Sequence, residues 1–529
     1  MTTDATATRP IIRNPVLPGF HPDPSILRVG DDYYLATSTF EWYPGVRLHH
    51  SRDMVHWRSL GGAITERRLL DLAGAGDSCG IWAPDLTHAG GRFYLVYTDV
   101  ASFASGYWDP QNYVIHAERI EGPWSDPIRL HGHGFDPSFF HDDDGATWML
   151  SMSADWRPGR DRFAGIEMQR FDRATGRLVG PTRIIFSGTE AGVTEGPHLY
   201  RKDGWYYLLT AEGGTSYEHQ ATVARSRQIE GPYEPDPAGP LLTSRGRPEL
   251  ALQKAGHGSL VETRAGEWYL AHLVGRPYTP LGKCVLGRET AIQQVTWVDE
   301  WPRIRGGVPA EETPAPDLPP HPWPAAEGFD HRHWSTLRRP ASPDWLSQTE
   351  RPGHLRIRGG QSPVGRQRPS LVARRVTARR CRLEVTMEFE PASFRHMAGV
   401  TGYYNSRNWH HAYVTVDEGR RVLDVLSCDS GVRRDHPGAR VELGAEARLG
   451  LAVSFDGPAL RFAYRTGGDW LTLPVELDAT ILSDEHAARI VHGEPEAWGF
   501  TGAFAGIWVQ DLGADGAYAD FDGIRYSED

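Results

Sequence analysis

The chain has 529 residues, a net charge of −12 at pH 7 and no cluster of basic residues. Such an acidic protein has no surface suited to a phosphate backbone, which argues against nucleic acid as a partner. No run of 18 consecutive apolar residues is present, so no segment is predicted to cross a membrane. The length exceeds that of a single hydrophobic core, and two or more domains are expected.

The N-terminus and the cysteines indicate a cellular compartment. The first ten residues, MTTDATATRP, lack a basic segment followed by an apolar one, so no signal peptide is predicted. The four cysteines, Cys79, Cys284, Cys381 and Cys428, are scattered and form no C-x-x-C pair. They fit reduced thiols better than a disulfide framework or a zinc site. We therefore expect a cytoplasmic protein.

One sequence pattern occurs five times between residues 19 and 273. Each copy has a turn of small residues, an apolar strand, a polar hairpin and a strand rich in Tyr, Trp and Leu. The copies are separated by 60, 53, 60 and 61 residues when they are aligned at Pro24, Pro84, Pro137, Pro197 and Gly258. A period of this length built from short strands is typical of a β-propeller in which each repeat is one four-stranded blade. The sequence therefore predicts an all-β protein with a five-bladed propeller.

A proline-rich segment, VPAEETPAPDLPPHPWP at residues 308–324, follows the repeats and is typical of a stiff, extended linker. Beyond it, strands of alternating polarity such as CRLEVTMEFEP are separated by Gly, Asp and Pro turns, which favours an antiparallel β-sandwich. We predict a propeller domain at residues 1–307, a linker at 308–324 and a β-sandwich at 325–529.

Chemically active side chains fall at equivalent places in the repeats. Because the first strand of each propeller blade lines the central axis, the turns before these strands converge on one end of the channel. These turns carry Asp23, Asp136, Glu195 and His257. Carboxylates placed so close together shift one another's pKa, a cost found mainly at functional sites. Two carboxylates across a pocket suit glycoside hydrolysis, and a third can keep the acid protonated.

Other roles remain open for these residues. Asp23 and Asp136 could each be turn residues whose side chains cap the following strand. His257 could be a substrate contact, a calcium ligand or a structural histidine. A non-catalytic propeller lectin is an alternative for the whole chain, but it should lack one or more of the three carboxylates. A retaining fructosidase-like propeller would have Asn-Asp-Pro, Arg-Asp-Pro and Glu-Cys motifs, and none stands in these turns.

These motifs together resemble glycoside hydrolase family 43, in particular its two-domain β-xylosidases and α-L-arabinofuranosidases. The resemblance covers nearly the whole chain and runs through NPVLPGFHPDPSI, GIWAPDL, GFDPSFFHDDDG, TEGPHLY, QKAGHGSLVE, LGRETAI and GFTGAFAGIWVQDL. The fold of that family is a five-bladed propeller, in agreement with the repeat count. The resemblance implies that Asp23 is the general base, Asp136 the residue that modulates the pKa of the acid, and Glu195 the general acid of an inverting mechanism.

The resemblance also implies substrate contacts. Arg288 in LGRET matches an active-site arginine, for which we expect a carboxylate or sugar-hydroxyl partner. Phe40 and Trp82 match aromatic residues of the sugar site, where C–H faces of sugars stack on rings, although packing within a blade is the alternative. Of the two phenylalanines in GFTGAFAG, we expect Phe504 rather than Phe500 to reach over the mouth of the propeller.

The activity implied by the resemblance is that of an exo-acting β-1,4-xylosidase, which releases xylose from the non-reducing ends of xylo-oligosaccharides. An α-L-arabinofuranosidase acting on arabinosyl substrates, or a bifunctional enzyme, is the alternative. No cofactor is expected for the chemistry. Some relatives hold a structural calcium ion in the channel, with His257 as the candidate metal ligand here, and relatives often form homo-oligomers.

Overall fold

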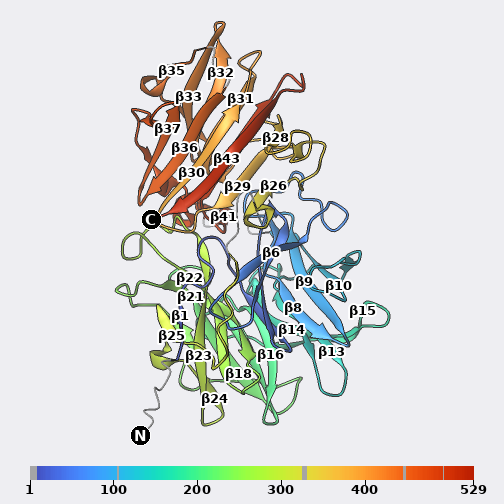
Figure 1. Cartoon of the computed structure of the whole chain (residues 1–529). Helices are drawn as coiled ribbons and strands as arrows, with labels where there is room; N and C mark the ends of the chain where they lie inside the picture. Colours follow the sequence, from blue (N-terminus) through green and yellow to red (C-terminus); the bar gives the residue numbers. More distant parts are fainter. Residues whose placement is uncertain (1–8, 104–106, 325–329, 445–447, 493) are drawn as a thin grey trace.

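The structure is a computed structural model that describes residues 9–103, 107–324, 330–444, 448–492 and 494–529. It confirms the all-β prediction, with a propeller and a β-sandwich stacked on each other (Figure 1). In this described part of the chain the one α-helix is α1 (Asp484–Ala487), and no helix there is long and apolar enough to span a bilayer. The predicted domain boundaries at residues 1 and 325 lie outside the described residues.

Five antiparallel sheets follow one another along the chain and form the five predicted blades. The first blade contains β2 (Ser25–Val29), β3 (Asp32–Thr37), β5 (Gly45–Ser51) and β6 (Arg58–Ile64). The second contains β7 (Gly80–Ile81), β8 (Asp85–Ala89), β9 (Arg92–Val100), β10 (Pro110–Ala117) and β11 (Ile128–Arg129). The third contains β12 (Ser138–His141), β13 (Thr147–Ala154), β14 (Phe163–Asp172) and β15 (Arg177–Phe186). The fourth contains β16 (Glu195–Lys202), β17 (Trp205–Glu212), β18 (Gln220–Ser226), β19 (Glu234–Pro235) and β20 (Leu242–Thr243). The fifth contains β21 (Gln253–Glu262), β22 (Trp268–Gly275), β23 (Arg288–Val298) and β24 (Trp301–Arg303).

The ring of blades is closed by the N-terminal segment and the proline-rich segment together. The innermost strands β2, β8, β12, β16 and β21 contact one another around the ring. Strand β1 (Ile11–Arg13) pairs with β25 (Glu312–Pro314), and the side chain of Asn14 bonds to the backbone of Ile292 in the fifth blade. Further along, Trp323 donates a hydrogen bond to the carbonyl of His56 in the first blade. Residues 308–324 thus run along the propeller surface from the fifth blade to the first.

The C-terminal region is a sandwich of two antiparallel sheets whose apolar faces pack on each other. One sheet contains β26 (Trp334–Leu337), β29 (Leu371–Arg375), β31 (His396–Asn405), β32 (Asn408–Asp417), β33 (Arg420–Asp429), β34 (Val432–Asp435), β35 (Val441–Glu442) and β42 (Phe504–Asp511). The other contains β27 (Leu346–Ser347), β28 (Leu355–Arg358), β30 (Arg380–Glu388), β36 (Arg448–Asp456), β37 (Ala459–Arg465), β38 (Leu471–Thr472), β39 (Leu477–Asp478) and β43 (Tyr518–Glu528). A short hairpin of β40 (Arg489–Val491) and β41 (Glu494–Ala497) lies at the junction with the propeller (Figure 1). Four 3₁₀ turns complete the described structure, at Arg305–Gly307, His331–His333, Pro437–Ala439 and Ala479–Ile481.

The sandwich and the propeller share a sheet edge and a core. Strand β4 (Trp42–Tyr43), which belongs to the first blade in sequence, pairs with β26 of the sandwich. The ring of Trp42 stacks on that of Phe504 from β42, with 3.9 Å between centroids. One buried aromatic cluster therefore contains side chains of both domains. Burial of its apolar surface stabilises the junction between them.

Candidate active site

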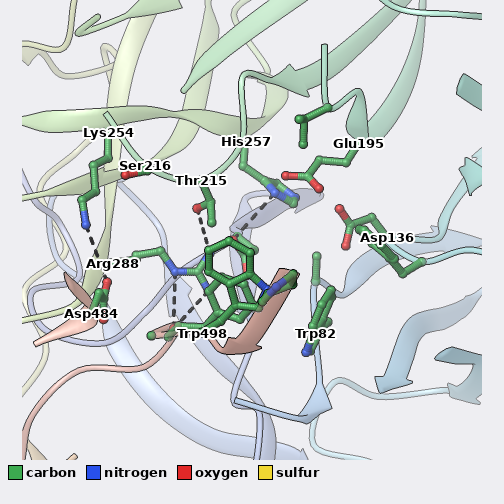
Figure 2. A pocket seen from close by; sticks show the side chains of 18 of the residues that line it. Trp82, Asp136, Glu195, Thr215, Ser216, Lys254, His257, Arg288, Asp484 and Trp498 are labelled. Atoms are coloured by element: carbon green, nitrogen blue, oxygen red, sulfur yellow. Dashed lines mark hydrogen bonds and ion pairs between the residues drawn. The ribbon is translucent and has the colours of Figure 1, made fainter. Parts of the chain in front are cut away.

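A cavity of about 460 Å³ lies between the two domains (Figure 2). Its walls contain the four polar side chains predicted to converge, together with residues of the sandwich: Asp23, Asp136, Glu195, His257, Asp484, Glu485, Trp498 and Phe500. A volume of this size is in the range of small-molecule sites. The repeat alignment therefore located the cavity correctly.

The same backbone turn recurs where the first strand of several blades begins. Asp23 and Asp136 both have a positive φ of 54°, and Gly196, at the corresponding position, has a φ of 57°. Among the amino acids, Gly adopts this left-handed conformation freely and Asp tolerates it better than most. The turn therefore favours these residue types for conformational reasons, and it also carries the Asp side chains, and Glu195 beside Gly196, to the cavity wall.

Asp23 is buried among groups that favour its charged form. One carboxylate oxygen accepts a hydrogen bond from Nη1 of Arg288 at 3.1 Å, and the other accepts one from the hydroxyl of Ser38 at 2.6 Å. Burial alone would raise the pKa of Asp23, but the Arg288 guanidinium, His257 and Ser38 together hold it below its usual value. Asp23 is therefore ionised at neutral pH.

Glu195 and Asp136 have the opposite protonation preference. Burial, followed by the negative charge of Asp23, raises the pKa of Glu195 to about 8. Burial and repulsion from Glu195 and Asp23 raise the pKa of Asp136 well above its usual value, although the backbone N–H of Gly196 donates to its carboxylate at 3.1 Å. The two side chains titrate as a coupled pair. This pair retains a proton at neutral pH, while Asp23 does not.

Arg288 connects the ionised carboxylate to the sandwich. Its Nη1 contacts both Asp23 and the hydroxyl of Thr215, at 3.1 and 3.0 Å. Its Nε and Nη2 donate to the backbone carbonyl of Phe500, at 3.3 and 3.0 Å. The guanidinium also lies over the rings of Phe40 and Phe500. The expected carboxylate partner of this buried arginine is thus Asp23.

Aromatic side chains form the apolar wall of the cavity. Phe40 and Trp82 line it as expected, and Trp82 is held by a hydrogen bond from Nε1 to the carbonyl of Ser78, at 3.0 Å. Sequence reasoning missed Trp108 and Trp498, which also line the cavity. Their only signal in the sequence is the abundance of tryptophan, because neither occupies an aligned position in the repeats.

The prediction for Phe504 was wrong. Phe504 is the first residue of β42, is completely buried and packs beneath the cavity on Trp42. Phe500 lines the cavity instead, with its ring edge-to-face with Trp82 at 5.5 Å. The reason is the backbone: residues 501–503 lie against residues 285–287 of the propeller, where Ala503 bonds to Val285. The chain turns into the strand after this contact, so the first phenylalanine remains in the loop and the second enters the core.

A charged group at the domain boundary was also missed. Lys254 is buried in an irregular stretch of β21, and its Nζ lies 2.5 Å from Glu485 and 3.8 Å from Asp484 of the sandwich (Figure 2). Burial raises the pKa of Asp484 to about 7, against the attraction of Lys254. These residues are some 230 positions apart in the chain, so no local pattern could have paired them.

His257 does not have the surroundings of a calcium ligand. Its Nδ1 faces Asp23 at 3.7 Å, and Gly196 lies against its Nε2, where a Cβ would come within 2.9 Å. Calcium takes six to eight oxygen ligands, whereas the carboxylate beside His257 already bonds to Arg288 and Ser38. Among the described residues, no group of three donors suited to a metal includes His257. Burial lowers the pKa of His257 to about 4, so the imidazole is uncharged at neutral pH.

An ionised and a protonated carboxylate in a covered cavity on a five-bladed propeller are the features of a glycoside hydrolase. Residues 12–302 match the family model described as glycosyl hydrolases family 43, and residues 329–527 match that of the β-xylosidase C-terminal concanavalin A-like domain. The chain belongs to glycosyl hydrolase family 43.

Individual relatives match over almost their whole length. The chain is 46% identical to "Xylosidase/arabinosidase 43B" of Humicola insolens, over 98% of each chain. It is 44% identical to "Xylan 1,3-beta-xylosidase" of a Vibrio species, over 98% of this chain and 99% of the relative. The crystal structure of xylan β-1,4-xylosidase from Bacillus halodurans C-125 superposes with a TM-score of 0.94 at 49% identity, and the match covers 98% of this chain and all of that one.

Proposed function

We propose that this protein is an inverting exo-β-xylosidase that removes single xylose units from the non-reducing ends of xylo-oligosaccharides. The observation that carries the proposal is the difference between two buried carboxyl groups in one cavity. Arg288 holds the pKa of Asp23 low, whereas burial and Asp23 raise that of Glu195 to about 8. A base that is ionised and an acid that is protonated at the same pH are what glycoside hydrolysis requires.

The chemistry is a single displacement. Glu195 donates its proton to the glycosidic oxygen as the bond between that oxygen and the anomeric carbon breaks. Asp23 accepts a proton from a water molecule, whose oxygen bonds to the anomeric carbon from the opposite face. The configuration is inverted, and Asp23 ends protonated and Glu195 ionised until solvent restores both. Arg288 keeps Asp23 charged before the reaction, and the Asp136–Glu195 pair retains the proton that is transferred.

The shape of the cavity supports removal of a terminal sugar. The sandwich contributes Trp498 and Phe500 on the apolar side of the cavity. On the polar side, Lys254 is held by Asp484 and Glu485 of the sandwich (Figure 2). A long polysaccharide passing through the site would have to displace these contacts, whereas a chain end would not.

The names of the relatives support xylose as the sugar and leave two further questions for experiment. One relative is named a xylosidase/arabinosidase, which favours α-L-arabinofuranosidase activity as the second candidate function. A β-1,3-xylosidase and a β-1,4-xylosidase both occur among the named relatives. Identity to the structure named a β-1,4-xylosidase is 49%, against 44% for the relative named a 1,3-β-xylosidase, so we propose β-1,4-xylobiose as the preferred disaccharide.

The test compares nitrophenyl β-xyloside with nitrophenyl α-arabinofuranoside, and β-1,4-xylobiose with β-1,3-xylobiose, using the full chain. NMR identifies the first anomer released. We expect the highest kcat/KM on β-xylosides and α-xylose as the first product. Release of β-xylose would contradict the inverting mechanism, and a higher kcat/KM on the arabinofuranoside would establish the second candidate in place of the first.

Three further properties stay predictions. The resemblance to the family implies a homo-oligomer, which light scattering of the purified protein tests. The four free cysteines fit a reducing compartment, so we propose a cytoplasmic location, which fractionation of the source cells tests. Some relatives hold a structural calcium ion in the channel, and a lower melting temperature after EDTA treatment, restored by CaCl₂, would support such an ion here, bound through groups other than His257.

A further inference from the structure

A second cluster of ligand-type side chains lies in the loop that leads to Asp136. The sequence HGHGFD spans residues 131–136, so His131 and His133 alternate with two glycines. A Cβ on Gly132 would come within 2.5 Å of the side chain of Gln111, and one on Gly134 within 1.7 Å of the carbonyl of Met152. Both glycines therefore lie against neighbouring chain, and the two imidazoles project together with their rings 4.1 Å apart and nearly parallel.

A buried carboxylate from the next blade meets both histidines. Glu167, on β14, is 5% exposed, and its Oε1 lies 2.6 Å from Nε2 of His133 and 3.4 Å from Nε2 of His131. The hydroxyl of Ser151 is also within 3.3 Å of this oxygen. All three ligand-type atoms are within 4.8 Å of one another. Two imidazoles and one carboxylate are the donor set of zinc sites that keep an open coordination position.

We propose that His131, His133 and Glu167 form a binding site for a divalent transition-metal ion, with Zn²⁺ as the best-fitting ion. Tetrahedral zinc with ligands at about 2.0–2.2 Å separates its donor atoms by about 3.4 Å. The Glu167–His131 distance already has this value. The Glu167–His133 distance must widen by roughly 0.8 Å to reach it, and His133 can move because its side chain is half-exposed. The exposed side of His133 also gives the ion a path from solvent.

The loop is well ordered for such a role. Asn112 on β10 bonds through its backbone to Leu130 and His131, and its side-chain amide donates to the carbonyl of Gly134 at 2.9 Å. The same amide nitrogen lies 3.3 Å from Nδ1 of His131. Binding of an ion at Nε2 places the proton on Nδ1, so the His131 ring would turn away from this amide nitrogen, which keeps its hydrogen bond to Gly134. The ion would bind only three residues before Asp136 in the chain.

The test is a titration of the full chain with ZnSO₄ by isothermal calorimetry, after removal of metals with EDTA and dialysis. We expect the unmodified protein to bind one equivalent of Zn²⁺ tightly. His133→Gln, which changes a half-exposed side chain, should weaken that equivalent more than about tenfold, and Glu167→Gln should do the same. His116→Gln is the matched control, because His116 lies in the same region of the second blade but outside the cluster. Replacement of Zn²⁺ by Co²⁺ should give a visible absorption band in the unmodified protein and in the control.

The outcomes separate a metal site from a hydrogen-bonded network. If the tight equivalent persists in His133→Gln, the ion binds elsewhere in this histidine-containing chain and the proposal is wrong. The proposal is equally wrong if the unmodified protein binds no tight equivalent. Because the readout is metal binding, failure of the proposed xylosidase activity would not affect the result. A circular dichroism spectrum and a melting temperature like those of the unmodified protein would show that His133→Gln is folded.

Discussion

Two phenylalanines four residues apart are expected to affect different properties when each is replaced by alanine. Phe504 is completely buried at the junction of the domains, where its ring stacks on Trp42 and meets Phe20 edge-on at 5.9 Å. Phe500 is only partly buried and lines the cavity. We expect Phe504→Ala to destabilise the protein and Phe500→Ala to weaken catalysis on short substrates.

The magnitudes follow from these environments. Truncation of a buried phenylalanine to alanine costs about 3–5 kcal/mol, a large share of the roughly 5–15 kcal/mol that stabilises a typical domain. Phe500 instead lines the cavity that would hold the sugar, and ring-stacking contacts contribute about 0.5–1.5 kcal/mol. Loss of this stacking energy in the bound state corresponds to a roughly 2- to 12-fold decrease in kcat/KM. Phe500→Ala should lower stability less than Phe504→Ala, because its ring borders open space.

The assay combines urea unfolding, followed by tryptophan fluorescence, with xylobiose kinetics at a temperature where all variants are folded. Phe394→Ala is the control, since Phe394 is 63% exposed on the sandwich and should change neither property. A lower kcat/KM in Phe504→Ala at unchanged stability, with the reverse in Phe500→Ala, would refute the assignment of the two rings.

Five other changes test the proposed chemistry and the role of the sandwich. Glu195→Gln should lose most activity on xylobiose but regain it on an aryl xyloside with a good leaving group, because acid catalysis contributes about 10²–10⁴-fold. Asp23→Asn should lose activity on both substrates, and a loss by Glu195→Gln that is equal on both would contradict the assignment. Asp136→Asn removes one member of the coupled pair, so the basic limb of the kcat/KM profile should move to lower pH. The pKa of Glu195 should stay above that of an ordinary glutamate because its burial remains. A basic limb that does not move would show that Asp136 is only a turn residue. Arg288→Gln removes the group that lowers the pKa of Asp23, so the acidic limb should move to higher pH. A chain ending near Trp301 should be poorly soluble because it exposes the apolar junction, and a soluble, fully active propeller would show that the sandwich is a separate module.

The five-bladed fold could be predicted because each repeat carries its own evidence. A turn, two strands and a polar hairpin at near-constant spacing predict one blade, and five copies predict the closed ring. The same regularity predicts that Asp23, Asp136, Glu195 and His257 lie together, since equivalent positions share one end of the channel. The structure places all four on the cavity wall.

Features that depend on contacts between the two domains could not be predicted in this way. The sequence contains two suitable phenylalanines, and the choice between them depends on where β42 begins. That point is set by its pairing with β29 and β31, where Phe504 lies opposite Arg375 and Tyr403. The pairing of Lys254 with Asp484 depends on the docking of α1 against the fifth blade, which no periodic pattern reports.

The contacts of Arg288 show why the sandwich is part of the catalytic site although it contributes none of the three proposed catalytic carboxylates. Two of the three nitrogens of this guanidinium bond to the carbonyl of Phe500, and the remaining one reaches Asp23. A guanidinium is planar, so anchoring one edge on the sandwich loop fixes the direction of the other edge toward the carboxylate. The ionisation of Asp23 depends on that direction, because Arg288 is the largest influence opposing its burial. The sandwich therefore acts on the proposed base through the arginine that it orients, in addition to covering the substrate.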